Sequence, residues 1–98
     1  HAESLGQYIL DSFHIQLADK PYIKEIRGKG LMIGIELTDA GTELAVLAKV
    51  KGVLLNITGG GRVVRMLPPL IMNQTEADLL VNTVSSLIRV YAGEDTAS

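Results

Sequence analysis

The sequence contains no cysteine and no tryptophan, and phenylalanine occurs only once. Without cysteine the chain has no disulfide, no thiolate metal site and no thiol nucleophile, which agrees with a reducing compartment such as the cytoplasm. Aromatic residues make up 4% of the chain, too few to form stacking platforms for single-stranded nucleic acid. The formal net charge is −2, and this weak balance provides no field that would attract a polyanion or an anionic membrane. We therefore expect protein or small-molecule partners.

Long apolar runs are also missing. The longest unbroken ones fall far short of the ~20 residues that span a bilayer, and no basic region followed by an apolar stretch opens the chain. Hydrophobic residues make up 47% and charged residues 20% of the 98 residues, proportions typical of one compact globular domain. The first residue is His1 rather than methionine, inside a predicted helix. We expect the sequence to be a piece of a longer protein.

The apolar pattern alternates between helical and strand periods along the chain. Apolar residues recur at helical spacing in three segments, and in four segments they follow the period of two that is typical of strands. The predicted helices cover residues 2–18, 42–50 and 75–91, and the predicted strands cover residues 22–27, 31–37, 53–57 and 63–67. The sequence therefore predicts an α+β fold, a small and mostly antiparallel sheet of about four strands with helices covering one face.

The residues between these segments predict where each element begins and ends. Gly28–Gly30 and Gly59–Arg62 are predicted turns, and Pro68–Pro69 ends the last strand because proline has no N–H for the sheet. Thr75 and Asp78 have the spacing of a capping box at the start of the last helix. The residues predicted to face the core are Leu5, Ile9, Phe13 and Leu17 in the first helix, Leu44, Leu47 and Ala48 in the second, and Leu79, Leu80, Val84, Leu87, Ile88 and Tyr91 in the third.

Several residues resemble parts of catalytic or binding motifs but lack the neighbouring residues that those motifs require. The glycines from Gly28 to Gly34 miss the spacing of a dinucleotide-binding loop by one residue, and a strand rather than a helix follows them. Gly59–Gly61 is not followed by the lysine and helix of a phosphate-binding loop. His1 and His14 are far apart and have no acidic residue at a metal-ligand spacing. The serines lack a nucleophile elbow. We predict neither a metal site nor a nucleophilic catalyst.

Arg65 is the strongest candidate for a binding residue. It lies inside the fourth predicted strand, where alternation places its side chain on the face opposite to Val64 and Met66. A guanidinium on a rigid strand can bind a substrate carboxylate through two parallel hydrogen bonds. A structural ion pair with Glu36 or Glu25 is the alternative, and the residues alone favour it because interior arginines usually pair with a protein carboxylate.

Three motifs together resemble a known enzyme family. They are IRGKGLMIGIEL (residues 26–37), GVLLN (residues 52–56) and VVRMLPPL (residues 63–70). Their order and spacing resemble the C-terminal small domain of class III pyridoxal-phosphate aminotransferases of fold type I, and within that family most of all the acetylornithine aminotransferases. The resemblance implies a small domain over residues 1–92, followed by a disordered tail over residues 93–98.

The resemblance also implies a role for Arg65. In the family, the arginine before the proline pair binds a substrate carboxylate, and this reverses the preference for an ion pair. The lysine that holds pyridoxal 5'-phosphate lies in a large domain outside this sequence, so no cofactor is expected on this chain and the chain alone should be inactive. The expected partners are that large domain, a second subunit of a cytoplasmic homodimer and the substrate carboxylate. Nucleic acid and membrane are not expected.

The implied reaction transfers an amino group from N-acetylornithine to 2-oxoglutarate, a step of arginine biosynthesis. Ornithine, succinylornithine and 4-aminobutyrate aminotransferases share much of the pattern, so their donors remain alternatives. From another class of function, a stand-alone regulatory domain that binds a small molecule has a similar order of elements, as does a purely structural scaffold.

Overall fold

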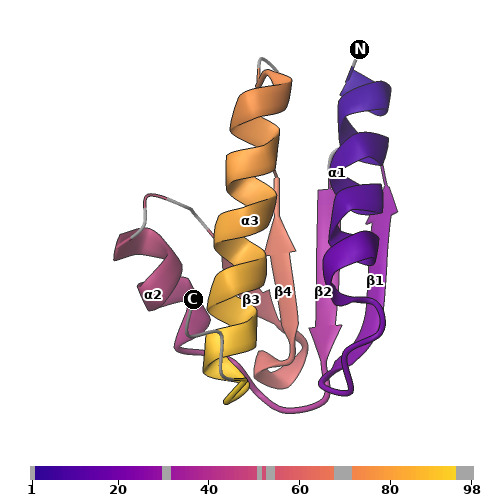
Figure 1. Ribbon diagram of the computed structural model, residues 1–98. Coiled ribbons are helices and arrows are strands. Elements are labelled where there is room, and N and C mark those ends of the chain that lie inside the picture. The colour runs from indigo at the N-terminus through magenta and orange to yellow at the C-terminus, as the bar shows by residue number, and fades with distance from the viewer. Residues whose placement is uncertain (1, 30–31, 51, 53–54, 68–71, 95–98) are drawn as a thin grey trace.

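The computed structural model describes residues 2–29, 32–50, 52, 55–67 and 72–94 of the chain. Within these residues, three α-helices and four strands follow one another in the predicted order (Figure 1). The helices are α1 (Ala2–Leu17), α2 (Leu44–Val50) and α3 (Gln74–Tyr91), the strands are β1 (Ile23–Lys29), β2 (Met32–Leu37), β3 (Asn56–Thr58) and β4 (Val63–Met66), and a 3-10 turn over Gly59–Gly61 joins β3 to β4. The predicted α+β fold is confirmed.

All neighbouring strands of the sheet are antiparallel, in the order β1-β2-β4-β3. The strand β2 is therefore an inner strand, as its fully apolar face predicts. Ile35 at its middle lies opposite Ile26 of β1 and Val64 of β4. The chain leaves β2, passes through α2 and returns at the far edge as β3, so that β4 closes the sheet between β3 and β2.

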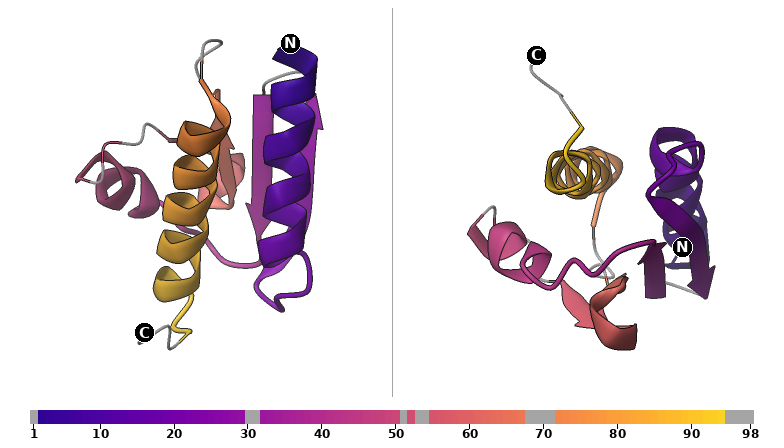
Figure 2. Two further views of the ribbon diagram at one scale, coloured as in Figure 1. Left: turned by 45° about the horizontal axis from the view of Figure 1, so that its top comes forward. Right: turned by 90° about the horizontal axis from the view of Figure 1, so that it is seen from below.

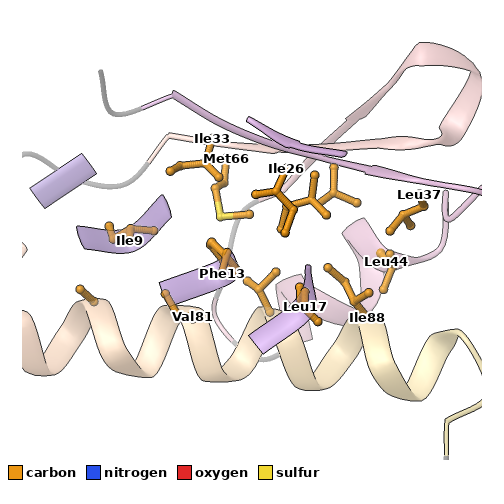
Figure 3. Close-up of a cluster of buried hydrophobic side chains, with 14 of the residues drawn as sticks. Ile9, Phe13, Leu17, Ile26, Ile33, Leu37, Leu44, Met66, Val81 and Ile88 are labelled. Atoms are coloured by element: carbon orange, nitrogen blue, oxygen red, sulfur yellow. The ribbon is translucent and has the colours of Figure 1, made fainter. Parts of the chain in front are cut away.

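The two long helices lie side by side on one face of the sheet, and α2 lies beside α3 (Figures 1 and 2). Between sheet and helices lies a single hydrophobic core to which every helix and the strands contribute (Figure 3). Ile33 and Ile35 of β2 have no exposed surface, since alternation points both toward the helices. The opposite face of the sheet is covered by none of the described helices.

The predicted apolar stripe of α1 is confirmed. Leu5, Ile9, Phe13 and Leu17 recur at every fourth position, and all four are buried. Phe13 is the largest fully buried side chain of the described residues and lies between β2 and α3 (Figure 3). A helix of this length is marginal in water, so its burial against the sheet supplies most of its stability.

The predicted capping box at Thr75 is wrong, because the N-cap of the helix lies two residues earlier. Asn73 is the N-cap of α3, and its side chain accepts a hydrogen bond from the backbone N–H of Glu76 at 2.8 Å. The Glu76 carboxylate in turn accepts one from the backbone N–H of Asn73 at 3.0 Å. This box satisfies two of the donors that a helix start leaves free.

Some predicted core positions in α2 and α3 are wrong. In α3 the buried residues begin at Ala77, and Leu79, about 200° further round the helix, is 66% exposed. Leu47 is exposed as well, because the short α2 buries only two residues four positions apart, Leu44 and Ala48. Tyr91, the last residue of α3, is also exposed. The positions of α3 that the apolar pattern missed are Ala77, Val81 and Ser85.

Strand ends also differ from the prediction. Gly28 and Lys29, predicted to lie in a turn, belong to β1 and pair with Ile33 and Met32 of β2. The predicted third strand is observed only from Asn56, and its first two residues, 53 and 54, lie outside the described residues. So do the proline pair at 68–69 and residues 95–98 of the predicted tail. No helix of the described part is long and apolar enough to cross a membrane.

A polar cluster ties the end of α3 to the turn between α1 and β1. The carboxylate of Glu94 accepts a hydrogen bond from the Tyr22 hydroxyl at 2.6 Å and lies 3.2 Å from the Lys20 ammonium. These contacts hold the pKa of the Glu94 carboxyl below its usual range, first through the Tyr22 hydrogen bond and then through Lys20. Glu94, assigned to the tail by the sequence, thus contacts the body of the domain.

The Asn73 cap predicts a clear difference between two neighbouring substitutions. We expect Asn73→Ala to lower the free energy of unfolding by about 1 kcal/mol, because the backbone N–H of Glu76 loses its partner. Thr75→Ala is the matched control, since Thr75 is exposed inside the helix, and its effect should stay within ~0.5 kcal/mol. Urea unfolding followed by circular dichroism measures both, and an equal loss in the two variants would contradict the cap assignment.

The Glu94 cluster predicts a pH dependence of stability. Because the folded pKa of Glu94 is depressed, its contribution is complete above the unfolded value of about 4.3 and is lost as pH falls through the folded pKa. Below about pH 4.3, the melting temperature of the wild-type chain should therefore fall more steeply than that of Glu94→Gln. Thermal melts of both chains between pH 3 and 7 test this, and parallel curves would refute it.

Candidate functional site

The uncovered face of the sheet carries a hollow that both predicted and unpredicted residues line. Alternation sends Met32, Gly34 and Glu36 of β2 to this face, because Ile33, Ile35 and Leu37 point into the core. The hollow has a volume of about 480 Å³. It is lined by Arg27, Gly28, Lys29, Met32, Gly34, Thr58, Gly59, Val63 and Arg65.

Arg65 lies at the centre of this face, where the sequence places it. Val64 and Met66 on either side are buried in the core, and Arg65 itself is half-buried on the opposite face. Its neighbours across the strands are Gly34 on β2 and Asn56 on β3. The backbone on both sides is hydrogen-bonded into the sheet, so the base of the side chain is held on a rigid element.

The predicted alternative partners of Arg65 bind a different arginine. Glu36 Oε1 lies 3.0 Å from Nη1 of Arg27, and Glu25 Oε1 lies 2.5 Å from the same nitrogen. Within the described part of the chain Arg65 has no ion pair, and its Nη2 instead donates to the thioether sulfur of Met32 at 3.4 Å. A thioether is a weak acceptor, so the guanidinium keeps most of its donors for other groups.

The contacts of Arg27 shift the pKa values of charged groups on the β1 side of this face. The hydrogen bond from Arg27 holds the pKa of the Glu36 carboxyl below its usual range, against the opposing effect of burial. The bonds to Glu36 and then Glu25 raise the pKa of Arg27 in return. Lys24 lies 3.7 Å from the other Glu36 oxygen. Arg27, Lys24 and the two carboxylates thus balance one another, whereas Arg65 and Lys29, which both line the hollow, have no such counterion in the described residues.

A second hollow approaches Arg65 from the β3 side. Its volume is about 340 Å³, and Met32, Leu55, Asn56, Arg65, Met66 and Leu67 line it. Arg65 and Met32 belong to both hollows and stand between them. A planar guanidinium with donors along two edges can therefore be reached from either side.

The motifs that the sequence rejected give no competing site in the described residues. No three metal-ligating side chains come together there, and His14 is exposed on α1. Gly59–Gly61 forms a turn with left-handed glycines that connects β3 and β4 and precedes a strand, not the helix start that a phosphate loop requires. The Ser12 hydroxyl donates to the backbone oxygen of Tyr8, as helix serines commonly do.

Sequence reasoning missed two members of the site. In the sequence, Arg27 looks like an ordinary charged residue of a strand with one solvent-exposed face, and Gly34 looks like a closely packed glycine inside a strand. The alternation of β1 and β2 could have placed both on the same face as Arg65. It could not have aligned them, because alignment depends on the register that pairs Arg27 with Gly34 and Gly34 with Arg65.

Comparison with known proteins gives the family context of this site. The sequence profile of the family described as "Aminotransferase class-III" matches residues 1–88. Acetylornithine aminotransferase 1 of Bordetella pertussis is 39% identical over 94 residues, which are 96% of this chain and 24% of the relative. Ornithine aminotransferase of Bacillus subtilis is 35% identical over 85 residues, or 87% of this chain and 20% of the relative.

Solved structures with a similar fold are also aminotransferases. Ornithine aminotransferase from Toxoplasma gondii superposes with a TM-score of 0.82 at 30% identity, over 94% of this chain and 22% of that one. Acetylornithine aminotransferase from Elizabethkingia anophelis superposes with a TM-score of 0.76 at 25% identity, over 89% of this chain and 24% of that one. The chain thus spans about a quarter of the length of the proteins it matches, and it belongs to the class III aminotransferase family.

Proposed function

We propose that this chain is the C-terminal small domain of an aminotransferase that transfers an amino group from N-acetylornithine to 2-oxoglutarate, and that Arg65 binds a substrate carboxylate. The observation that carries the proposal is the guanidinium of Arg65, which is half-buried in a hollow and has no ion pair among the described residues. An arginine in such a place normally has a carboxylate partner. A substrate would supply it.

The geometry supports a positioning role. The guanidinium offers a planar set of donors that matches the two oxygens of a carboxylate, and such charge-assisted bonds are about twice as strong as neutral ones. Arg65 is fixed between β2 and β3, so a carboxylate bound there has a defined place relative to the sheet. Holding a reactant in place lowers the barrier of a reaction whose chemistry occurs elsewhere.

Pyridoxal 5'-phosphate is the cofactor that the proposal requires, and it would supply the electron sink of the transamination. This cofactor partly occupies the active site of the Toxoplasma gondii ornithine aminotransferase. The lysines described here do not fit the role of its imine-forming amine. Lys20 and Lys24 are ion-paired, and Lys29 and Lys49 are exposed, whereas a nucleophilic lysine is typically desolvated in a pocket. This supports our assignment of the cofactor site to the large domain.

The proposal includes partners for the uncovered face. A chain that spans about a quarter of its relatives leaves about three quarters of such an enzyme to form the rest of the cleft. We propose that this remainder, the large domain, completes the site around Arg65, that a second subunit completes the enzyme as a cytoplasmic homodimer, and that the chain alone is inactive.

Ornithine is the second candidate donor, since the Bacillus subtilis relative is an ornithine aminotransferase at 35% identity. Succinylornithine and 4-aminobutyrate are further donors used in the family. We favour N-acetylornithine because several relatives named acetylornithine aminotransferase reach 39% to 40% identity.

The carboxylate role of Arg65 can be tested on the chain itself. We expect N-acetylornithine and 2-oxoglutarate to cause saturable NMR shifts centred on Arg65, with dissociation constants on the order of millimolar. Arg65→Ala should weaken binding at least ~10-fold, since a charge-assisted bond contributes about 1.5–3 kcal/mol. Arg65→Lys should restore it only in part, because lysine keeps the charge but not the planar set of donors.

The matched control is Arg62→Ala. Arg62 is exposed in the turn before β4 and does not line either hollow beside Arg65, so its loss removes the same charge without touching the site. Unchanged binding in Arg62→Ala and lost binding in Arg65→Ala support the proposal. Equal losses in both variants, or binding that persists without Arg65, would show that the carboxylate is attracted by charge in general or binds elsewhere.

A further inference from the structure

Gly34 occupies an unusual place for a glycine. It lies inside β2, an inner strand, directly between Arg27 of β1 and Arg65 of β4. A glycine inside a strand weakens the sheet and often marks a position that another group approaches closely. Gly34 is not among the glycines with a positive φ, so its backbone conformation is one that any residue adopts.

The packing of the described residues does not require a glycine at this position either. A Cβ built on Gly34 would lie 3.8 Å from Cγ of Arg27 and 3.8 Å from Cγ1 of Val63, which are ordinary van der Waals distances. The contrast with Gly28 is clear, because a Cβ there would lie 3.1 Å from Leu10 in the core. An alanine therefore fits at position 34, and the packing of the described residues gives no reason for a glycine there.

The absent side chain has an effect on the hollow. Gly34 lines it beside Arg65, so its missing Cβ leaves a notch between Arg65, the stem of Arg27 and Val63. We propose that Gly34 is a specificity-determining position, whose notch receives the carbon chain of a carboxylate ligand bound by Arg65. This inference rests on the proposed function of Arg65 and adds to it the part of the ligand that the site selects.

The walls of the notch indicate what kind of chain fits. On the β1 side the contacts are Cγ of Arg27 at 3.8 Å and its Nε at 4.0 Å, and the guanidinium is already paired with Glu36 and Glu25. On the β4 side the contact is the methyl group of Val63. Neither wall offers a free charge, so the notch suits the uncharged carbon atoms next to a carboxyl group rather than a second acidic group.

The test compares two carboxylates of equal charge and different length. Acetate has only a methyl group, whereas 2-oxopentanoate carries a longer uncharged chain. Both are titrated by NMR against the wild-type chain, Gly34→Ala, Arg62→Ala and Arg65→Ala, and the melting temperature of each chain is measured. Arg62→Ala is the control, since Arg62 lies in the turn before β4 and lines neither hollow.

We expect Gly34→Ala to bind acetate as the wild type does and to bind 2-oxopentanoate about 5-fold more weakly or worse, because overfilling a packed space is costly. Its melting temperature should rise by roughly 2–6 °C, since alanine restricts the unfolded chain. Arg62→Ala should leave the ratio of the two affinities unchanged, and Arg65→Ala should weaken both.

The outcomes separate this inference from the proposed function. If Arg65→Ala abolishes binding and Gly34→Ala leaves the affinity ratio unchanged, the notch has no role in selection, and the carboxylate role of Arg65 stands. If the melting temperature of Gly34→Ala falls, the fold itself requires the glycine, and the inference is wrong. If no carboxylate binds the wild type in a saturable way, both proposals fail.

Discussion

The fold and the site both depend on the burial of only one face of the sheet. Alternation along β2 and β4 sends Ile33, Ile35 and Val64 into the core that α1 and α3 cover, and it sends the residues between them to the other face. A shift of one residue in register would exchange the two sets, burying Arg65 among apolar side chains. The hydrophobic core therefore fixes the position of the candidate site.

The same constraint explains how far the sequence could be interpreted. Period-two and helical patterns predict every helix and strand, and the side of the sheet to which Arg65 belongs. They do not decide between Asn73 and Thr75 as the cap of α3, because each has a carboxylate three residues later. The choice depends on the packing of the helix on the rest of the domain, and this is a tertiary property.

The partners of the arginines could not be predicted for a similar reason. The sequence shows that Glu25, Glu36 and Arg65 share a face, but not which of them are neighbours. Register decides that question: Glu25 lies opposite Glu36, and Glu36 lies opposite Val63. Both carboxylates are thus on the β1 side, next to Arg27, and they bind that arginine instead of Arg65.

This uneven distribution of carboxylates makes two arginines of one row chemically different. Arg27, Gly34, Arg65 and Asn56 lie opposite one another across the four strands. The next row on the same face of the sheet begins with Glu25 and Glu36 on β1 and β2 and ends with Val63 and Thr58 on β4 and β3. Arg27 is therefore neutralised within the sheet, while Arg65 faces an aliphatic and a hydroxyl neighbour that cannot balance its charge. The difference between Arg27, which is ion-paired, and Arg65, which has no ion pair among the described residues, thus arises from the residues of the next row.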